Sequence, residues 1–357
     1  MRKLLDVLLS VYEIPLKIVL RCCGNDIEKN ILRHFIRKLN LNHFYTQVKF
    51  YPKKASELNQ YHGTGKDFSD CAIILQGPIV MEDDFTLETI KLYRSYYSKV
   101  NIIVSTWENC DVNFEKEIDG LQVKLIKSKY PNINGVGNIN YQIVSSLNGV
   151  EYAEELNVDY IWKTRTDQRY YHPFALDYLK NKIAMTPNKV VCLGGIRNSF
   201  VNRYFQLSDF MLFGNTKNVK AYYSCPLDNE DSKTSKYTRK NQNEKLEYYN
   251  QYLKAVKQAE IDGRICVENK FDDCSVFYCN PEVMLHYGYY CNVSEIQGLD
   301  SYKEKYRDFL KNYVDIVDAE IIGFFWKKYE LEFMCENYFE RIGKLDSIRY
   351  VVESEKG

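Results

Sequence analysis

The sequence predicts an α/β fold in which a mainly parallel β-sheet is flanked by helices, with helical additions at both ends of the chain. From Asp70 onward, short apolar runs alternate with amphipathic stretches of helical length. Strands that alternate with helices in this way form βαβ units, whose strands lie parallel in one sheet. The segment 158–169 also begins apolar and ends in charge, as expected of a buried strand that reaches a ligand site.

The expected elements follow from the periodicity of the apolar residues. The run Cys71–Leu75 is apolar throughout, which is typical of a strand covered on both faces. The segment 83–99 has apolar residues at helical spacing and begins with an aspartate that can cap a helix. Further strands are expected at 101–104, 121–126, 160–169, 190–193 and 210–213, and further helices at 138–156, 245–261, 302–313 and 325–342.

Three regions are expected along the chain. Residues 1–68 form a basic helical segment, residues 69–300 form the α/β domain, and residues 301–357 form a helical C-terminal appendage. The stretch at about 226–245 is almost without apolar residues and rich in Lys, Asn, Asp and Ser. It is therefore expected to be an exposed, mobile insertion in the domain.

The start of the chain is basic, because residues 1–55 hold eleven Lys and Arg against four Asp and Glu. Asp6, Glu13 and Lys17 interrupt its leucine-rich run, so neither a signal peptide nor a membrane span is expected there. A helix expected at 30–40 has an apolar stripe beside basic residues. Such a helix either lies on an anionic membrane surface or packs on the main domain like any surface helix.

Composition narrows the class of protein. The 357 residues have a formal net charge of zero and a sequence pI of about 6.9, so no nucleic-acid partner is expected. The eleven cysteines are odd in number and scattered, and the five histidines lie far from them in sequence. This usage indicates a reduced, cytoplasmic compartment and argues against a zinc knuckle or a disulfide scaffold.

The charged end of the segment 158–169 is the leading candidate for a site. If it continues as a strand, Lys163, Arg165, Asp167 and Arg169 project from one face. Ligands of open α/β sheets bind outside the carboxyl ends of the strands, so this row predicts a phosphate-bearing substrate. The alternative is a solvated edge strand with mixed charge.

Residues of three further segments are candidates for donor binding. Gln76, Gly77 and Pro78 end the first strand, where a small residue lets backbone approach a ligand, although many such glycines are only turns. Ser105, Thr106 and Trp107 end the second strand, where the indole either stacks on a base or belongs to the core. Asn140 and Gln142 open a helix, where amides bond a ribose or sugar, or cap the helix.

Four carboxylates are candidates for catalysis. Asp167, beside a diphosphate, can hold Mn²⁺ or Mg²⁺, hard ions that take oxygen ligands. Alternatively, or in addition, the cations around it neutralise the leaving diphosphate directly. Asp209, Glu268 and Glu282 can each act as the base that activates an acceptor hydroxyl, or be structural.

Several of these segments together resemble the WavE-type lipopolysaccharide-synthesis proteins, a bacterial glycosyltransferase family. The resemblance covers roughly residues 70 to 330 and rests on the order and spacing of the segments 73–78, 105–107, 138–142, 163–169, 208–210 and 281–282. It implies a GT-A-like, Rossmann-related core that uses a nucleotide-sugar donor at the inner face of the cytoplasmic membrane. GT-A enzymes carry Asp-x-Asp at the strand end, whereas Arg165-Thr166-Asp167 keeps only the second acid, which puts the metal in question.

The residues and the resemblance together predict a cytoplasmic, peripherally membrane-associated glycosyltransferase. It would move a sugar from a nucleotide donor to a lipid-linked or oligosaccharide acceptor of lipopolysaccharide or capsule. In this hypothesis Trp107 and Ser105 hold the base, Lys163 and Arg165 face the diphosphate, and Asp167 orients metal or sugar. The alternatives are a sugar nucleotidyltransferase and a non-catalytic glycan- or nucleotide-binding component of an assembly complex.

Overall fold

The fold is that of a computed structural model, which describes residues 51–58, 65–194, 205, 207–228, 281–294 and 302–329. The described residues from Lys53 onward belong to one compact unit. The expected helices at 30–40 and 245–261, most of the insertion at 226–245, and Glu268 lie outside the described residues.

A seven-stranded, mostly parallel sheet forms the centre of this unit, in the order β3-β2-β1-β4-β7-β6-β8. Among these strands only β7 runs antiparallel to its neighbours β4 and β6. The prediction of a mainly parallel sheet flanked by helices is confirmed, and its order 3-2-1-4 is that of a Rossmann-related sheet. The strands are β1 Cys71–Gln76, β2 Asn101–Trp107, β3 Val123–Ser128, β4 Tyr160–Arg165, β6 Val190–Gly194, β7 Leu212–Asn215 and β8 Val314–Asp318.

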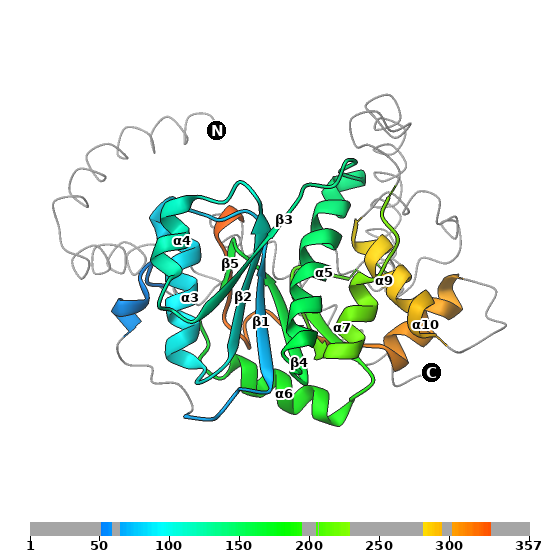
Figure 1. The fold of residues 1–357 in the computed structure, drawn as a ribbon. Helices are drawn as coiled ribbons and strands as arrows, with labels where there is room; N and C mark the ends of the chain where they lie inside the picture. Colours follow the sequence, from blue (N-terminus) through cyan, green and yellow to red (C-terminus); the bar gives the residue numbers. More distant parts are fainter. Residues whose placement is uncertain are drawn as a thin grey trace, which may run out of the picture. The chain divides into compact units, whose positions relative to one another are not determined.

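Helices cover both faces of the sheet (Figure 1). One face carries α3 Phe85–Tyr96, α4 Val112–Ile118 and α6 Ala175–Met185. The other carries α5 Ile139–Glu155, α7 Thr216–Tyr223, α9 Pro281–Val293 and α10 Tyr302–Asn312. The apolar runs of the strands are buried on both faces for this reason, as the uninterrupted run in β1 predicts.

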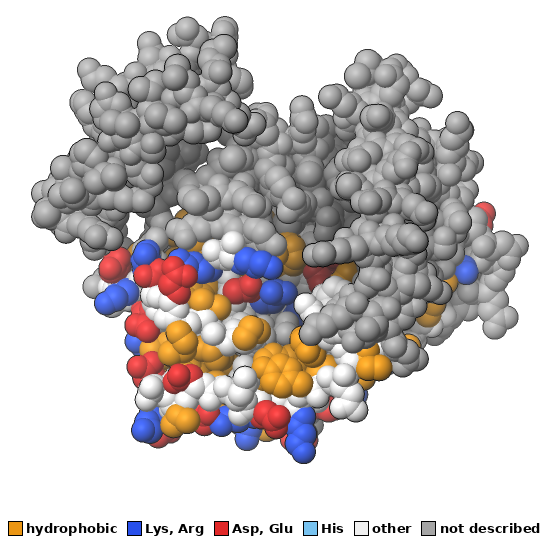
Figure 2. Space-filling view, turned by 90° about the horizontal axis from the view of Figure 1, so that it is seen from above, with side chains coloured by type: hydrophobic (Ala, Val, Ile, Leu, Met, Phe, Trp, Pro, Cys, Tyr) orange, Lys and Arg blue, Asp and Glu red, His pale blue; other side chains and the backbone are white. Residues whose placement is uncertain are grey.

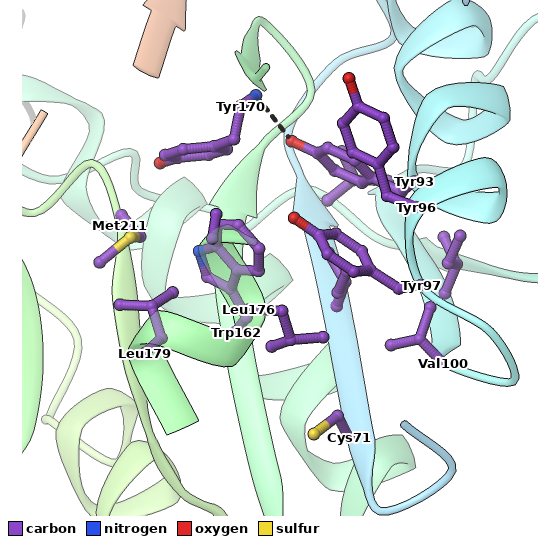
Figure 3. Close-up of a cluster of buried hydrophobic side chains, with 14 of the residues drawn as sticks. Cys71, Tyr93, Tyr96, Tyr97, Val100, Trp162, Tyr170, Leu176, Leu179 and Met211 are labelled. Atoms are coloured by element: carbon purple, nitrogen blue, oxygen red, sulfur yellow. Dashed lines mark hydrogen bonds between the residues drawn. The ribbon is translucent and has the colours of Figure 1, made fainter. Parts of the chain in front are cut away.

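Aromatic side chains join α3 to the strand β4 (Figure 3). The Trp162 ring lies 6.1 Å from the ring of Tyr93 and 4.8 Å from that of Tyr170. The backbone N–H of Tyr170 donates to the Tyr93 hydroxyl at 3.2 Å. Because Tyr170 lies just beyond the carboxyl end of β4, these contacts fix the segment that follows the strand.

Two expectations for the strands and the C-terminal region are wrong. The segment 160–169 is not one strand, because a turn at Thr166 and Asp167 separates β4 from the short β5 Gln168–Tyr170. The described part of 301–357 is not a purely helical appendage. Here β8 joins the main sheet beside β6, and β9 Phe324–Trp326, where a helix was expected, pairs with β5.

The expected helices at 83–99, 138–156 and 302–313 are confirmed as α3, α5 and α10. The sequence reading did not foresee α4, α6, α7 and α9. In the part of the chain that the structure describes, no helix is both long and apolar enough to cross a membrane.

Candidate functional site

The candidate residues meet at the carboxyl ends of neighbouring strands. From β1 the chain proceeds through β2 to β3, then returns past β1 to β4, so the direction of winding changes between β1 and β4. Ligands of open α/β sheets bind at such a switch point. Gln76 is in register with Ser105 on one side and with Arg165 on the other. These three residues therefore lie side by side at the carboxyl ends of β1, β2 and β4.

The ends of β1 and β4 are joined closely at Gly77. The Thr166 N–H donates to the Gln76 carbonyl at 3.1 Å, and the Thr166 hydroxyl donates to the Pro78 carbonyl at 2.6 Å. Gly77 has φ 123°, and a Cβ there would lie 3.1 Å from the Thr166 Oγ1. The conformation and the space at this turn therefore both favour glycine.

Arg165 and Asp167 form a bidentate ion pair at this edge. Arg165 Nε and Nη2 donate to the two carboxylate oxygens at 2.9 and 3.2 Å, and the Trp326 indole N–H donates to Oδ2 at 3.0 Å. Burial alone raises the pKa of Asp167, but the Arg165 charge and these hydrogen bonds outweigh it and hold the pKa below its usual value. Both side chains keep partial exposure, 29% for Arg165 and 16% for Asp167.

This donor set does not fit a preformed metal site. Both oxygens of Asp167 already accept hydrogen bonds from cationic or indole donors, and a guanidinium lies where a second acid would be needed. Among the described residues, no group of three or more His, Cys, Asp or Glu side chains is placed to hold a metal ion.

Lys163 lies beneath the edge rather than on it. Its side chain is fully buried, with Nζ 3.4 Å from the Asp209 carbonyl and 5.5 Å from the centre of the Tyr223 ring. Burial lowers the pKa of Lys163 to about 7, although the negative charge of Asp209 opposes the shift. Gln142 donates to the same carbonyl at 3.5 Å. A buried amine with a strongly lowered pKa next to a switch point is a functional candidate.

Trp107, at the end of β2, is the innermost of three aromatic rings, of which one follows β3 and one lies in the first turn of α5. Only 4% of Trp107 is exposed. The Tyr130 ring stacks on it at 4.5 Å and 18°, and the Tyr141 ring meets it edge-on at 5.3 Å. Tyr130 therefore covers the indole face that the sequence reading assigned to a base, and the exposed ring of the stack is Tyr130.

Several predicted donor-binding side chains hold the scaffold instead. Gln76 donates to the Ser145 hydroxyl at 2.8 Å, and the Ser105 hydroxyl donates to the Ser145 carbonyl at 2.6 Å. The Asn140 amide bonds the Ile133 carbonyl and both backbone groups of Asp228. These contacts bind α5 and its preceding loop to the strand ends; Thr106 is also buried.

The placement of Arg169 in the cationic row is wrong. Because the turn interrupts the strand, Arg169 points to α3, on the face opposite Lys163, where it is 1% exposed. Its guanidinium donates to the carbonyls of Phe85 and Lys53 and to the Thr89 hydroxyl, each at 2.8 Å, and lies 4.3 Å from the Phe85 ring centre. Arg169 therefore supports the fold and does not reach the strand ends.

The two described candidate bases lie close to the same edge. Asp209 precedes β7, whose antiparallel pairing brings its start beside the end of β4. Glu282 lies in the first turn of α9, next to Pro281, which closely approaches Gly137 before α5. Asp209 is 7% exposed, whereas Glu282 is half-buried.

Figure 2 shows positive, negative and hydrophobic side chains interspersed on the described part of one face of the molecule. The sequence reading missed two residues near the strand ends, Tyr130 and Trp326. The aromatic run Phe324-Phe325-Trp326 is a visible signal, but Phe325 and Trp326 fall in the helix expected at 325–342. Tyr130 follows β3 by two residues, and the rule that strand ends carry the site could have found it.

Comparison with solved structures finds weak likenesses. A 4-diphosphocytidyl-2C-methyl-D-erythritol synthase from Anaerococcus prevotii is 13% identical over 76% of this chain and 98% of its own, with a TM-score of 0.35. A cytidylyltransferase from Leptospira borgpetersenii is 14% identical over 71% of this chain and 97% of its own, with a TM-score of 0.29. Likeness at this level carries no argument about this chain. No curated protein matches the sequence.

The sequence pattern described as WavE lipopolysaccharide synthesis matches residues 71–270, which is more than half of the chain. The match includes the strand ends that carry Gly77, Trp107, Arg165 and Asp167, together with Asp209. The chain therefore belongs to the WavE lipopolysaccharide synthesis family.

Proposed function

We propose that the protein is a glycosyltransferase that moves a sugar from a nucleotide-sugar donor to a lipopolysaccharide or capsular glycan acceptor. The observation that carries the proposal is the switch point beside Gly77, where Arg165, in register with Gln76 at the end of β1, forms an ion pair with Asp167. A partly exposed, fixed guanidinium suits a diphosphate, because Arg recognises phosphate oxygens in a planar, bidentate manner. Membership in a lipopolysaccharide synthesis family supports the substrate class.

In this proposal Arg165 contacts the donor diphosphate and stabilises the charge that develops on it as the glycosidic bond to the sugar breaks. Asp167 and Trp326 hold the guanidinium in position, and the exposed edge of Asp167 faces the donor sugar. Lys163, which is buried two residues before Arg165 in β4, adds positive charge to the region under the diphosphate. Asp209 or Glu282 accepts the proton of the acceptor hydroxyl.

The rival enzyme class is a sugar nucleotidyltransferase. Such an enzyme needs a glycine-rich, basic phosphate loop directly after the first strand. Gly77-Pro78-Ile79-Val80 contains no Lys or Arg, its Gly77 N–H donates to the Ser105 carbonyl at 3.0 Å, and its Pro78 carbonyl accepts from the Thr166 hydroxyl. This loop favours the transferase.

Product analysis tests the proposal. The full chain is incubated with a panel of nucleotide sugars and a lipid-linked glycan acceptor, and the released product is identified. A transferase releases free nucleoside diphosphate only when acceptor is present. Release of pyrophosphate from a nucleoside triphosphate and a sugar phosphate would instead identify a nucleotidyltransferase, and a binding component would release neither.

We further propose that the protein works at the cytoplasmic face of the membrane, with residues 1–55 as a peripheral contact. Their surplus of seven cations supports attraction to anionic lipid. Sedimentation with anionic liposomes tests this. Deletion of residues 1–25 should release the protein into the supernatant, and salt should weaken binding of the full chain. Equal partition of both proteins would contradict it.

A further inference from the structure

Tyr130 is an exposed aromatic residue that is held in one orientation. The residue is 41% exposed, yet one face of its ring stacks on the buried Trp107, at 4.5 Å and 18°. The Tyr141 ring meets it edge-on at 5.6 Å. The Tyr130 hydroxyl donates to the Asn109 side-chain oxygen at 2.9 Å. A planar apolar ring is thus fixed by contacts at its inner face, its edge and its hydroxyl, while part of it faces solvent.

Such a ring can bind another flat ring at low entropic cost. Binding normally costs the ordering of side chains at the interface, and that cost is small when the side chain is already fixed. Bases of single-stranded nucleic acids stack on tyrosine and tryptophan in this way without regard to base identity. An isolated surface tyrosine would lack the backing ring and the hydroxyl contact.

The separation between Tyr130 and Arg165 indicates which class of ligand could contact both residues. Ser105 and Gln76 are in register with each other and with Arg165, and Trp107 lies two residues beyond Ser105, hence on the same face of the sheet. Trp107 ends β2, which is two strand spacings, or roughly 10 Å, from β4, and the Tyr130 ring lies a further 4.5 Å from the Trp107 ring. A ligand that reaches both points needs an aromatic ring at one end and an anionic group at the other. A nucleoside diphosphate has both, whereas a neutral sugar has neither.

We infer that Tyr130, backed by Trp107, is the stacking platform for the base of the nucleotide donor. The inference rests on the proposed function and assigns to Tyr130 the role that the sequence reading gave to Trp107. The inference also predicts how the site distinguishes one nucleotide base from another. Because the platform offers a ring face, it contributes affinity for any base, and groups at the base edge must select among bases.

Calorimetric titration of the full chain with UDP, CDP, GDP, ADP and inorganic pyrophosphate tests the inference. Tyr130→Ala should weaken binding of the nucleoside diphosphates by about 5- to 150-fold, the range measured for loss of one stacked base. Pyrophosphate has no ring, so its affinity should not change. Tyr130→Phe keeps the ring and should bind nucleotides within a few-fold of the wild type. Tyr178→Ala is the matched control, because Tyr178 is 37% exposed but lies on α6, on the opposite face of the sheet.

The outcomes separate this inference from the proposed function. If the wild type binds nucleoside diphosphates and folded Tyr130→Ala binds them equally well, the platform is wrong and the transferase proposal stands. An equal loss of pyrophosphate affinity would also overturn the platform, because it indicates general damage to the site. If folded wild type binds none of the nucleotides, the proposed function fails and the platform fails with it. Should the alanine variant not fold, Tyr130→Leu supplies the same comparison.

Discussion

Arg165 Nε and Asp167 Oδ1 lie 2.9 Å apart across the turn that ends β4, and the second oxygen of Asp167 accepts from both Arg165 and Trp326. The carboxylate that sequence motifs would assign to a metal is therefore already satisfied by protein donors. In this arrangement the acid fixes the direction of the cation, and the cation is the group suited to a diphosphate.

Asp167→Asn should lower the turnover number by about a hundredfold or more, because the neutral amide no longer holds the guanidinium by charge and hydrogen bonds. The fold should survive, since Arg165 is partly exposed and water can replace the lost acceptor. Initial rates of nucleoside diphosphate release measure the effect. Asp177→Asn is the control. Asp177 lies on α6 and accepts a hydrogen bond from Lys66 at the surface, so this variant should keep wild-type turnover. Wild-type turnover in Asp167→Asn would remove this acid from the mechanism.

Metal dependence should be partial. Mn²⁺ or Mg²⁺ is expected to stimulate transfer, but activity should persist in EDTA because Arg165 already provides positive charge at the diphosphate. Mn²⁺ should bind the nucleotide-free protein only weakly, which electron paramagnetic resonance can measure. Arg165→Asp restores two acids at the strand end and should make activity strictly metal-dependent or abolish it. Tight Mn²⁺ binding to the nucleotide-free wild type, with full loss of activity in EDTA, would contradict this prediction.

Arg169→Met should destabilise the protein by about 3 kcal/mol or more, because it removes the donor to the buried Phe85 carbonyl and Thr89 hydroxyl and to the part-buried Lys53 carbonyl. Nucleotide affinity of the folded fraction should not change, since Arg169 is 1% exposed and its guanidinium bonds α3, on the face of the sheet opposite Lys163. Urea unfolding and calorimetric titration together check both statements. A variant of normal stability with weakened nucleotide binding would show that Arg169 contributes to donor binding after all.

The sheet and its edge could be predicted because they depend on local patterns. The apolar runs of β1 and β2 identify buried strands, and parallel pairing then brings Gln76, Ser105 and Arg165 to one edge. The turn after Arg165 could not be predicted in the same way. It depends on Thr166 bonding to Pro78, 88 residues earlier.

Trp326 and Tyr130 could not be predicted as site residues, because their roles also depend on contacts between residues far apart in the sequence. Trp326 contacts Asp167 across 159 positions, through a β5–β9 pairing that no local pattern encodes. Tyr130 matters because its ring covers Trp107, and only the packing of the two strand ends reveals which ring is exposed. Residue types and spacing therefore predict the edge that carries the site, whereas tertiary contacts decide which side chains face a ligand there.

Lys163→Met should stabilise the protein at neutral and lower pH while reducing transfer. Burial lowers the pKa of Lys163 to about 7, against about 10.4 in an unfolded chain. Below pH 7 the amine is charged in both states, so the folded state carries the full cost of burying the charge. Between pH 7 and about 10 the unfolded chain holds more protons than the folded one, so this cost declines as pH rises, by up to about 1.4 kcal/mol per unit. Methionine has similar length and no charge, so it removes both the cost and its pH dependence.

Thermal melts of the wild type and Lys163→Met between pH 6 and 9.5 provide the measurement. The melting temperature of the variant should exceed that of the wild type most at pH 6, and the difference should shrink as pH rises. Lys180→Met is the control, since Lys180 pairs with Asp70 at 2.6 Å and its pKa is raised, so its titration lies above this range. A Lys163→Met variant that is less stable than the wild type at pH 6 would mean that the charged amine contributes more to the folded state than its burial costs. A stable but inactive variant would identify Lys163 as a residue retained for function at the expense of stability.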